Sequence, residues 1–372
     1  MKPTIKKILL ALVAILIVIS VWYLESRKAN VAPSNSSVQE VNLNLSSQNA
    51  EERISAKKEK YEVAKEITTP DGFINTDGIT VNELIGKKVI LVDFWTYSCI
   101  NCQRTLPYLN TWYERYEKDG LEILAIHTPE FDFEKEYENV KRAVEKYGIK
   151  YPVILDNDFS TWQAYKNRYW PRKYLIDIDG FIVYDHIGEG AYDETEEKIV
   201  ELLNERAKVL GENAVEMKDG KIDAESVDSS MVKTPETYFG YSRLEYLQNL
   251  PSKDCYDKDC AFSLDEKSLA KDAFALEGVW KILKESMQVG EVGSSIYLNF
   301  EANKVNFVAG GFDNTPVRVQ IFLDGQEVKD GVVTITNADL YNLIDLQGKP
   351  GRHTLQIKAL DKGLEAFTFT FG

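Results

Sequence analysis

Cys99 and Cys102 are the residues of this chain best suited by type and spacing to do chemistry. They follow an apolar, strand-like run, Val89–Trp95, and precede a helical pattern. At the start of a helix, free backbone N–H groups and the helix dipole stabilise a thiolate, whereas a sulfur one turn further along lies inside the helix. The spacing therefore predicts a redox dithiol in which Cys99 attacks a disulfide and Cys102 resolves the mixed disulfide that forms.

Two other interpretations of the same cysteine pair stay open: half of a zinc site, or an inert structural disulfide. A structural zinc ion takes four protein ligands, and no second pair of cysteines or histidines lies close to this one in the sequence. The three histidines are scattered along the chain, at His127, His186 and His353. We therefore expect no metal and no bound cofactor at this motif.

Strand-like and helical patterns alternate around the dithiol, from about residue 69 to residue 210. Strands are expected at Val89–Phe94, Leu121–His127, Tyr151–Leu155, Lys173–Ile178 and Phe181–Ile187, and helices at Cys102–Tyr116, Phe133–Tyr147 and Asp193–Leu210. This alternation predicts a layered α/β fold, and the tight Asp-Gly turn between the last two strands requires an antiparallel pair. Upstream, Phe73–Ile79 is expected to form a small hairpin, followed by a helical turn at Val81–Ile85.

The C-terminal residues 272–372 carry the pattern of an all-β domain. Alternating apolar and polar residues mark strands at Ile296–Phe300, Val317–Leu323, Leu355–Ala359 and Phe367–Phe371. Short alternating strands separated by turns predict a sandwich or jelly roll. Residues 211–271 are expected to be a connector. Within it, Cys255 and Cys260 are expected to form a local structural disulfide, with a second redox relay and an acidic calcium loop as alternatives.

The N-terminus has the features of a membrane signal-anchor. Lys2, Lys6 and Lys7 precede an uninterrupted apolar run from Ile8 to Leu24. The run reaches the short end of the range for a membrane span, and no clean cleavage site follows it. We expect residues 1–25 to be an uncleaved anchor that leaves the bulk of the chain outside the cytoplasm, with a cleaved signal peptide as the alternative. Residues 26–68 are expected to be a tether.

Length and charge bound the class of protein. At 372 residues, the chain is long for one compact domain. Its formal net charge of −15 argues against nucleic acid as a partner, because a nucleic-acid-binding surface has to neutralise phosphates.

Longer segments around the dithiol resemble a known family. They are Trp95 to Tyr108, which contains the cysteine pair, His127 to Phe131, and Tyr169 to Asp177. Together they resemble the extracytoplasmic region of DipZ-type, TlpA-like thiol-disulfide oxidoreductases, over about residues 70–372. The resemblance implies a thioredoxin-like domain at 69–210 and, at 272–372, a β-sandwich similar to a carbohydrate-binding module.

The resemblance also implies roles for residues near the dithiol. Asp93, six positions before Cys99, matches the buried acid of thioredoxins and could exchange a proton with a thiol. Trp170 and Pro171 match the cis-proline loop, whose backbone could pair with an extended substrate. The residues expected to carry catalysis are therefore Cys99, Cys102, Asp93 and Pro171, and those expected to bind substrate are Trp170, Trp95 and Ser98.

Two further features near these segments have two interpretations each. Residues 168–173 contain a basic and aromatic cluster, Arg168, Tyr169, Trp170, Arg172 and Lys173, which is either a docking surface for substrate or a solvated loop. His127 follows a strand and is either catalytic or, as is commoner for a strand-end histidine, structural.

These observations predict a membrane-anchored, extracytoplasmic thiol-disulfide oxidoreductase that reduces disulfide-containing protein substrates. Ile100 and Asn101 place no cation or histidine between the sulfurs, and a strongly oxidising poise depends on stabilising the reduced form. DipZ proteins carry a multi-helix electron-transporting membrane domain ahead of this region, whereas we expect a single span here. The resemblance therefore implies a separate membrane electron donor of the CcdA/DsbD type.

Two alternative functions stay open. A thiol peroxidase is one, because Thr96 and Cys99 form half of a peroxiredoxin signature; however, Val92 stands where that signature has proline, and electrostatic support for peroxide cleavage is missing. The other is a non-catalytic envelope protein whose β-sandwich binds cell-wall carbohydrate. Trp280, Tyr297 and Tyr341 could stack on a sugar ring, although aromatic residues of a sandwich are more often core.

Overall fold

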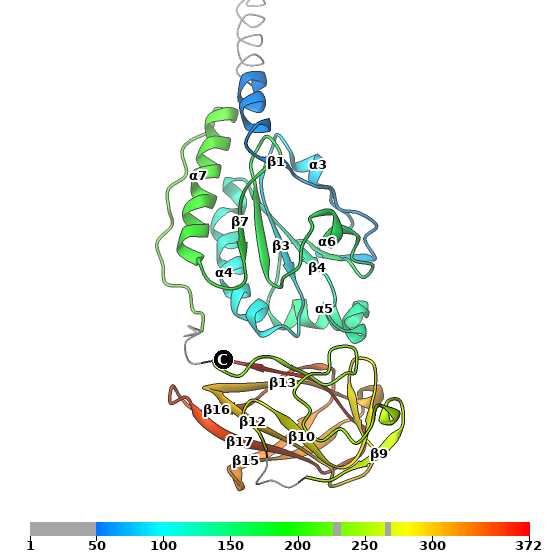
Figure 1. Cartoon of the computed structure of the whole chain (residues 1–372). Helices are drawn as coiled ribbons and strands as arrows, with labels where there is room; N and C mark the ends of the chain where they lie inside the picture. The colour runs from blue at the N-terminus through cyan, green and yellow to red at the C-terminus, as the bar shows by residue number, and fades with distance from the viewer. Residues whose placement is uncertain (1–49, 226–231, 265–268) are drawn as a thin grey trace, which may run out of the picture. The chain divides into compact units, whose positions relative to one another are not determined.

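The structure, a computed structural model, describes residues 50–225, 232–264 and 269–372. The expected signal-anchor and the first part of the expected tether lie outside these residues. Within the described ranges, no helix combines the length and the apolar character needed to span a membrane. Residues 50–58 are helical, and Glu62–Gly372 form one compact unit (Figure 1).

A seven-stranded mixed sheet forms the first half of this unit. Its strand order is β1-β7-β6-β3-β4-β5-β2. The strands are β1 Glu62–Val63, β2 Gly72–Ile74, β3 Val89–Trp95, β4 Leu121–His127, β5 Val153–Leu155, β6 Arg172–Ile176 and β7 Phe181–Ile187. The central strand β3 runs parallel to β4 and antiparallel to β6, and all its residues are buried. The predicted α/β fold with an antiparallel pair is confirmed.

Helices cover both faces of this sheet. They are α3 Val81–Leu84, α4 Ile100–Tyr116, α5 Tyr137–Lys146, α6 Ser160–Ala164 and α7 Tyr192–Leu210, with 3-10 turns η1 Glu117–Asp119 and η2 Asp132–Lys135. Figure 1 shows α4 and α7 on one side of the sheet and α3 and α6 on the other. Leu91 and Trp95 of β3 pack with apolar residues of α4, α5 and α7, whereas Ile90 and Val92 pack with α3 on the opposite face. Because strand side chains alternate, Asp93 points to the α4 face.

The expected hairpin at Phe73–Ile79 is wrong. Strand β2 instead pairs antiparallel with β5, so that Phe73 lies opposite Ile154. The Asp-Gly pair then belongs to the loop that leads into α3, where the Thr80 side chain caps the helix by accepting from the Glu83 backbone N–H. Pairing with an existing sheet edge satisfies the strand's backbone groups, which an isolated two-stranded hairpin does only marginally.

The second half is all-β, as predicted. Its strands are β8 Thr237–Tyr238, β9 Asp259–Phe262, β10 Phe274–Ile282, β11 Met287–Val289, β12 Ser295–Ala302, β13 Lys304–Gly311, β14 Val317–Leu323, β15 Gln326–Ile335, β16 Asp339–Asp345, β17 Gly351–Ala359 and β18 Leu364–Phe371. Nine of them follow the order β15-β14-β17-β12-β10-β11-β18-β13-β16, while β8 pairs with β18 and β9 with β10. Their apolar side chains form one large core. Short 3-10 turns lie at η4 Lys253–Cys255 and η6 Phe312–Asn314.

The stretch expected to be a connector contributes to this all-β half. Strands β8 and β9 belong to its sheet, and Phe239 is completely buried in its core. Cys255 and Cys260 are joined by a disulfide with 5.6 Å between their Cα atoms. Neither β8 nor β9 has a regular alternation of apolar and polar residues, which is why the sequence pattern did not reveal them.

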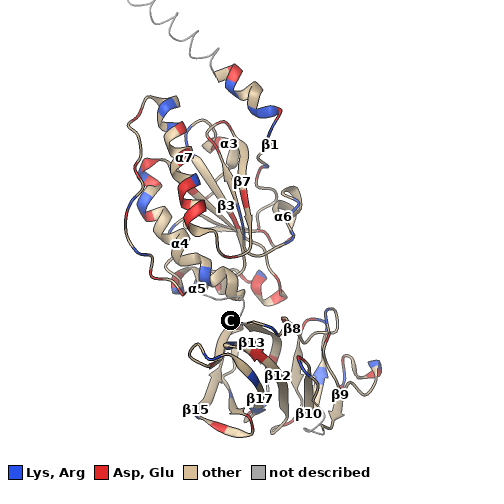
Figure 2. Ribbon diagram, turned by 60° about the vertical axis from the view of Figure 1, so that its left-hand side comes forward, with Lys and Arg blue, Asp and Glu red and all other residues tan. Residues whose placement is uncertain are grey.

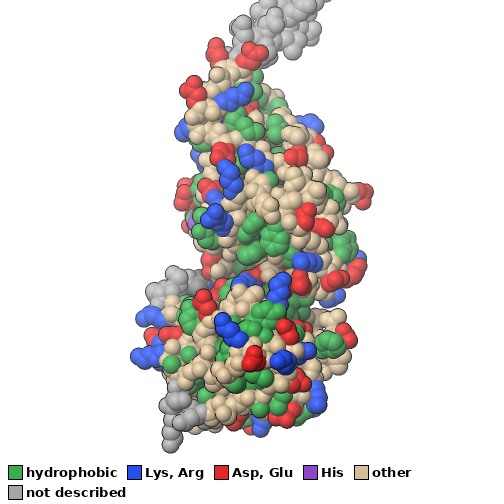
Figure 3. Space-filling view, turned by 45° about the vertical axis from the view of Figure 1, so that its right-hand side comes forward, with side chains coloured by type: hydrophobic (Ala, Val, Ile, Leu, Met, Phe, Trp, Pro, Cys, Tyr) green, Lys and Arg blue, Asp and Glu red, His purple; other side chains and the backbone are tan. Residues whose placement is uncertain are grey.

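Charged residues are mixed over the surface. Figure 2 shows acidic and basic residues interspersed along the helices and loops, and Figure 3 shows the same mixture on one face.

Candidate active site

The two cysteines of the motif differ sharply in their surroundings. Cys99 is the N-cap residue of α4, and its Sγ accepts a hydrogen bond from the Cys102 backbone N–H at 3.4 Å. Both are free thiols, with Cys99 half-buried and Cys102 only 1% exposed. Burial, and then the hydrogen bond with Cys99, raise the pKa of the Cys102 thiol well above its ordinary value. Cys99 is therefore the sulfur that another protein can reach, and Cys102 needs help to lose its proton.

Asp93 can give that help. It lies on the α4 face of β3 and is 1% exposed, and among the described residues its Oδ1 has no hydrogen-bond partner. Burial raises the pKa of its carboxyl to about 7, while the charge of Lys173 opposes the rise. The negative charge of Asp93 in turn contributes to the raised pKa of Cys102. A carboxyl with a pKa close to neutral is suited to exchange a proton with a thiol at physiological pH.

Lys173 lies inside the protein beside this acid. It is opposite Asp93 in the antiparallel pairing of β3 and β6, so both side chains share one face of the sheet. It is 0% exposed, and its Nζ donates to the Gly188 carbonyl at 3.1 Å. Burial lowers the pKa of Lys173, and the charges of Asp93, Cys102 and Glu189 oppose that shift. The inclusion of Lys173 in an exposed basic cluster was therefore wrong.

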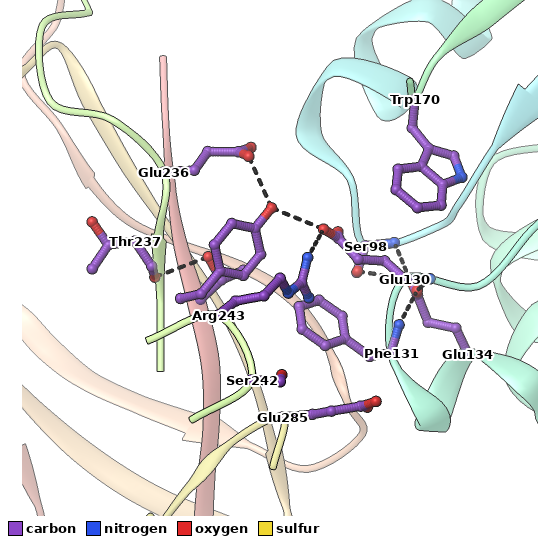
Figure 4. A network of polar contacts seen from close by, with 12 residues as sticks. Ser98, Glu130, Phe131, Glu134, Trp170, Glu236, Thr237, Ser242, Arg243 and Glu285 are labelled. Carbon is purple, nitrogen blue, oxygen red and sulfur yellow. Dashed lines mark hydrogen bonds and ion pairs between the residues drawn. The ribbon is translucent and has the colours of Figure 1, made fainter. Parts of the chain in front are cut away.

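Glu134 is a site residue that sequence reasoning missed. It comes from η2, is completely buried, and its carboxylate accepts hydrogen bonds from Ser98 and from the backbone of its own loop (Figure 4). Its Oε1 accepts from the backbone N–H and the hydroxyl of Ser98 at 3.2 and 2.7 Å, and its Oε2 accepts from the N–H groups of Glu130 and Phe131 at 2.6 and 3.1 Å. Burial, followed by the charge of Glu130, raises the pKa of Glu134 to about 7, although hydrogen bonds from Thr96 and Ser98 oppose the rise.

Ser98 and Trp95 do not have the exposure that substrate binding requires. Ser98 is 1% exposed and its hydroxyl is engaged by Glu134. Trp95 is completely buried in the core under α4, with its ring at 5.2 Å from that of His127 in an edge-to-face contact. Neither side chain can contact a docked protein in this structure. Both expectations of direct substrate binding are therefore corrected: Ser98 anchors the turn before Cys99, and Trp95 packs beneath it.

His127 has the surroundings of a structural residue. It is completely buried and stacks on Tyr97, with 5.8 Å between the ring centroids. Burial lowers the pKa of His127 to about 3, so its imidazole is neutral at physiological pH. This supports the structural interpretation of His127.

Trp170 and Pro171 lie in the loop before β6, in the same half of the unit as the dithiol. The Trp170–Pro171 peptide bond is cis, as the resemblance implied. Trp170 is half-buried against the core under α4, and its indole N–H donates to the Thr128 carbonyl at 3.0 Å. Trp162 packs against the Trp170 ring at 4.3 Å. Trp170 thus keeps part of its surface in solvent.

A group of three carboxylates lies at the other end of β6. Ligand atoms of Asp177, Asp179 and Glu205 lie within 4.8 Å of one another. Each of these residues also interacts with other groups of the protein, and we assign no metal to them.

Two family models match the two halves of the chain. One, described as the AhpC/TSA family, matches residues 61–185, and the other, described as a thioredoxin-like C-terminal domain, matches residues 234–372. The second match begins close to β8, in agreement with the structure. The first match covers β1 to β6, most of β7, the cysteine pair and the cis-proline.

Known relatives cover either most of this chain or its first half. Protein DipZ of Mycobacterium tuberculosis is 35% identical over 82% of this chain and 43% of its own length. The thiol-disulfide oxidoreductase ResA of Bacillus anthracis is 35% identical over 38% of this chain and 79% of its own length. The chain thus spans less than half of the DipZ relatives. A solved structure of a thioredoxin-like protein in the oxidised form is 26% identical over 39% of this chain and 97% of that one, with a TM-score of 0.37.

Proposed function

The chain belongs to the DipZ- and ResA-like thiol-disulfide oxidoreductases, and from this premise we propose that it reduces protein disulfides outside the cytoplasm through Cys99 and Cys102. The observation that carries the proposal is the contrast between the two sulfurs. Cys99 is half-buried at the helix start, while Cys102 is buried and its pKa is raised in part by the charge of Asp93, an acid whose own pKa is about 7. This asymmetry supports one attacking and one resolving thiol.

The proposed reaction has two exchange steps. In the first, the Cys99 thiolate attacks one sulfur of the substrate disulfide; the substrate S–S bond breaks, and its other sulfur leaves as a thiolate. In the second, Cys102 gives its proton to Asp93 and attacks the Cys99 sulfur, which releases the second substrate thiolate. Two electrons pass to the substrate, and a Cys99–Cys102 disulfide forms. The loop at Trp170 and Pro171 is the proposed place for the extended substrate segment.

Every turnover leaves the enzyme oxidised, so it needs a source of two electrons. We propose a membrane electron transporter of the CcdA/DsbD type as this donor, and anchoring by residues 1–25 on the extracytoplasmic side. The charge pattern around the apolar run and the resemblance to DipZ support this location. The donor would have to reduce the same exposed sulfur, Cys99, by the reverse of the two steps.

Reduction of insulin disulfides by the full chain tests the proposed function. The wild-type chain with a chemical reductant is expected to accelerate insulin precipitation, whereas Cys99→Ser is expected to leave the background rate. Equilibration with glutathione is expected to give a reduction potential below about −200 mV, nearer to thioredoxin than to strong oxidases. A value near −120 mV would reject the reductive direction and favour a disulfide-introducing oxidase.

Thiol peroxidase is the second candidate, because the first-half family model is described as AhpC/TSA. Consumption of hydrogen peroxide by the reduced chain discriminates the two functions. A reductase is expected to consume it no faster than a small dithiol does, since no cationic group supports peroxide cleavage in the motif.

Of the aromatic residues considered for sugar binding, Trp280 is completely buried and Tyr297 almost so, and we do not propose a carbohydrate ligand.

The disulfide between Cys255 and Cys260 is expected to act through stability alone. The variant with both Cys255→Ser and Cys260→Ser is expected to keep insulin reductase activity within about threefold of wild type while its melting temperature falls, because a structural bridge mainly constrains the unfolded chain. Activity and thermal melts of the same preparation check this. A hundredfold loss of activity in a folded variant would instead indicate an electron relay between the two cysteine pairs.

A further inference from the structure

The all-β half packs against the loop that holds the dithiol turn. Phe131 and Phe133, which follow β4, contact Phe367 of β18 at centroid distances of 5.3 and 4.6 Å. Phe131, Phe367 and Val308 form a separate buried cluster within the compact unit. This apolar contact places the two halves side by side at the active-site loop.

A polar contact accompanies the apolar one. The Glu130 carboxylate accepts from Arg243 Nη1 at 2.7 Å and from the Tyr238 hydroxyl at 2.8 Å (Figure 4). The Arg243 guanidinium also lies over the rings of Tyr238 and Phe131, at 3.8 and 5.0 Å. The Glu130 side chain is 13% exposed in this ion pair and that of Arg243 is 38% exposed. A partly buried, charge-assisted pair holds its geometry better than an exposed one.

Direct hydrogen bonds continue from this pair to the residue before Cys99. The backbone N–H of Glu130 donates to Glu134 Oε2 at 2.6 Å, and Glu134 Oε1 accepts from both the N–H and the hydroxyl of Ser98. A second contact reaches the same turn, because the Tyr97 hydroxyl donates to the Ala338 carbonyl of the all-β half at 3.1 Å. The all-β half therefore contacts the dithiol turn directly and through Glu130 and Glu134.

The charges along this path depend on Arg243. Its guanidinium is paired with the Glu130 carboxylate, and the charge of Glu130 is one cause of the raised pKa of Glu134. Without Arg243, the charge of Glu130 would lack its ion-pair partner, which favours protonation of Glu134. A protonated carboxyl has an O–H donor in place of one acceptor, so it cannot keep all the hydrogen bonds that fix Ser98 and the loop.

We propose that Arg243 and Tyr238 of the all-β half are positioning residues for the dithiol: by holding Glu130 they keep Glu134 on Ser98, and so keep Cys99 in its helix-capping position. The proposal rests on the proposed function and gives the all-β half a part in it. Loss of the path lets the turn move away from the helix start, where N–H groups and the dipole stabilise the attacking thiolate.

Arg243→Ala in the full chain tests the proposal. We expect Cys99 of the reduced variant to be alkylated by iodoacetamide at least threefold more slowly at pH 7, as measured by mass spectrometry. The equilibrium constant with glutathione is expected to shift at least threefold toward the stronger reductant, because the reduced form loses stabilisation. Arg243→Lys keeps a positive charge at this position and is expected to match wild type in both measurements.

Two further variants make the result decisive. Arg318→Ala removes an exposed pair between Arg318 and Asp361 in the same half, and is expected to change neither measurement. Tyr238→Phe keeps the ring but loses its hydroxyl, so it gives a smaller slowing of about twofold even if Arg243→Ala does not fold. A lower melting temperature with unchanged alkylation and equilibrium constant would show that Arg243 is merely structural, and overturn the proposal. Failure of the wild-type chain to reduce insulin would reject the proposed function and leave this comparison intact.

Discussion

Cys102→Ser is expected to accumulate covalent mixed disulfides with client or donor proteins, whereas Cys99→Ser accumulates almost none. The reason is the difference in exposure: only Cys99 can reach a substrate sulfur, and the fully buried Cys102 can attack only its neighbour. Without the resolving sulfur, no thiolate attacks the mixed disulfide at Cys99, and the intermediate therefore accumulates. Both variants are expected to lose reductase activity, Cys99→Ser by roughly a thousandfold because the nucleophile itself is gone.

Trapping in the native host measures this difference. Cells that carry either variant are quenched with acid, free thiols are alkylated, and covalent complexes are separated without reductant and identified by mass spectrometry. The two variants are matched controls for each other, since both replace one cysteine of the same motif by serine. Equal amounts of complex from both would reject the assignment of attacking and resolving roles.

The elements that carry the dithiol could be predicted from sequence because their signals are local. The apolar run of β3 was placed to within one residue, and β4 and β7 have the predicted bounds. Buried strands of an α/β sheet are continuous apolar runs, which short windows of sequence reveal. The helix at the cysteine motif was expected from Cys102, and α4 begins slightly earlier, at Ile100. Asp93 was recognisable because one acid interrupts an otherwise apolar strand.

Glu134 and Lys173 could not be predicted, because long-range packing gives each its surroundings. Glu134 is 36 residues from Ser98 in the sequence, and nothing distinguishes it there from the many surface acids of the chain. Lys173 follows Arg172 in a charged segment, and its inward direction depends on the pairing register of β6 with β3. A shift of one residue in that register would exchange the faces of these two side chains. The same limit applies to β13, whose six central residues are all buried and show no alternation.

Asp93→Asn is expected to slow resolution of the mixed disulfide at least tenfold at pH 7, an effect within the range for loss of a general base. In the wild type, the rate of this step is expected to rise with pH and level off above about 7, where Asp93 is ionised and can accept the Cys102 proton. The variant has an amide that accepts no proton at these pH values, so the inflection near pH 7 is expected to disappear. Rapid-quench kinetics with a small disulfide substrate, followed from pH 5 to pH 9, measure both effects.

The same substitution slows the reaction but is expected to raise the stability of the fold at alkaline pH. Burial raises the pKa of Asp93 from 3.8 to about 7, so the folded state holds this proton more tightly than the unfolded state does. The free energy of unfolding contributed by the protonated group is fully present below about pH 4 and is lost as pH rises through about 7. The loss is at most a few kcal/mol, and Asp93→Asn removes it; at pH 8 the variant should therefore unfold at a higher denaturant concentration than wild type.

The stability gained by Asp93→Asn is limited, because the buried Lys173 loses the opposing charge of Asp93 in the variant. Asp156→Asn is the matched control, since Asp156 is also buried but accepts hydrogen bonds from Thr161 and Trp162 at the start of α6. This control is expected to keep the inflection near pH 7. If Asp93→Asn kept the inflection as well, another group would have to take the proton from Cys102. Slower resolution, loss of the inflection and greater stability at alkaline pH in the same variant would identify Asp93 as the acid that takes the proton of Cys102 at a cost in stability.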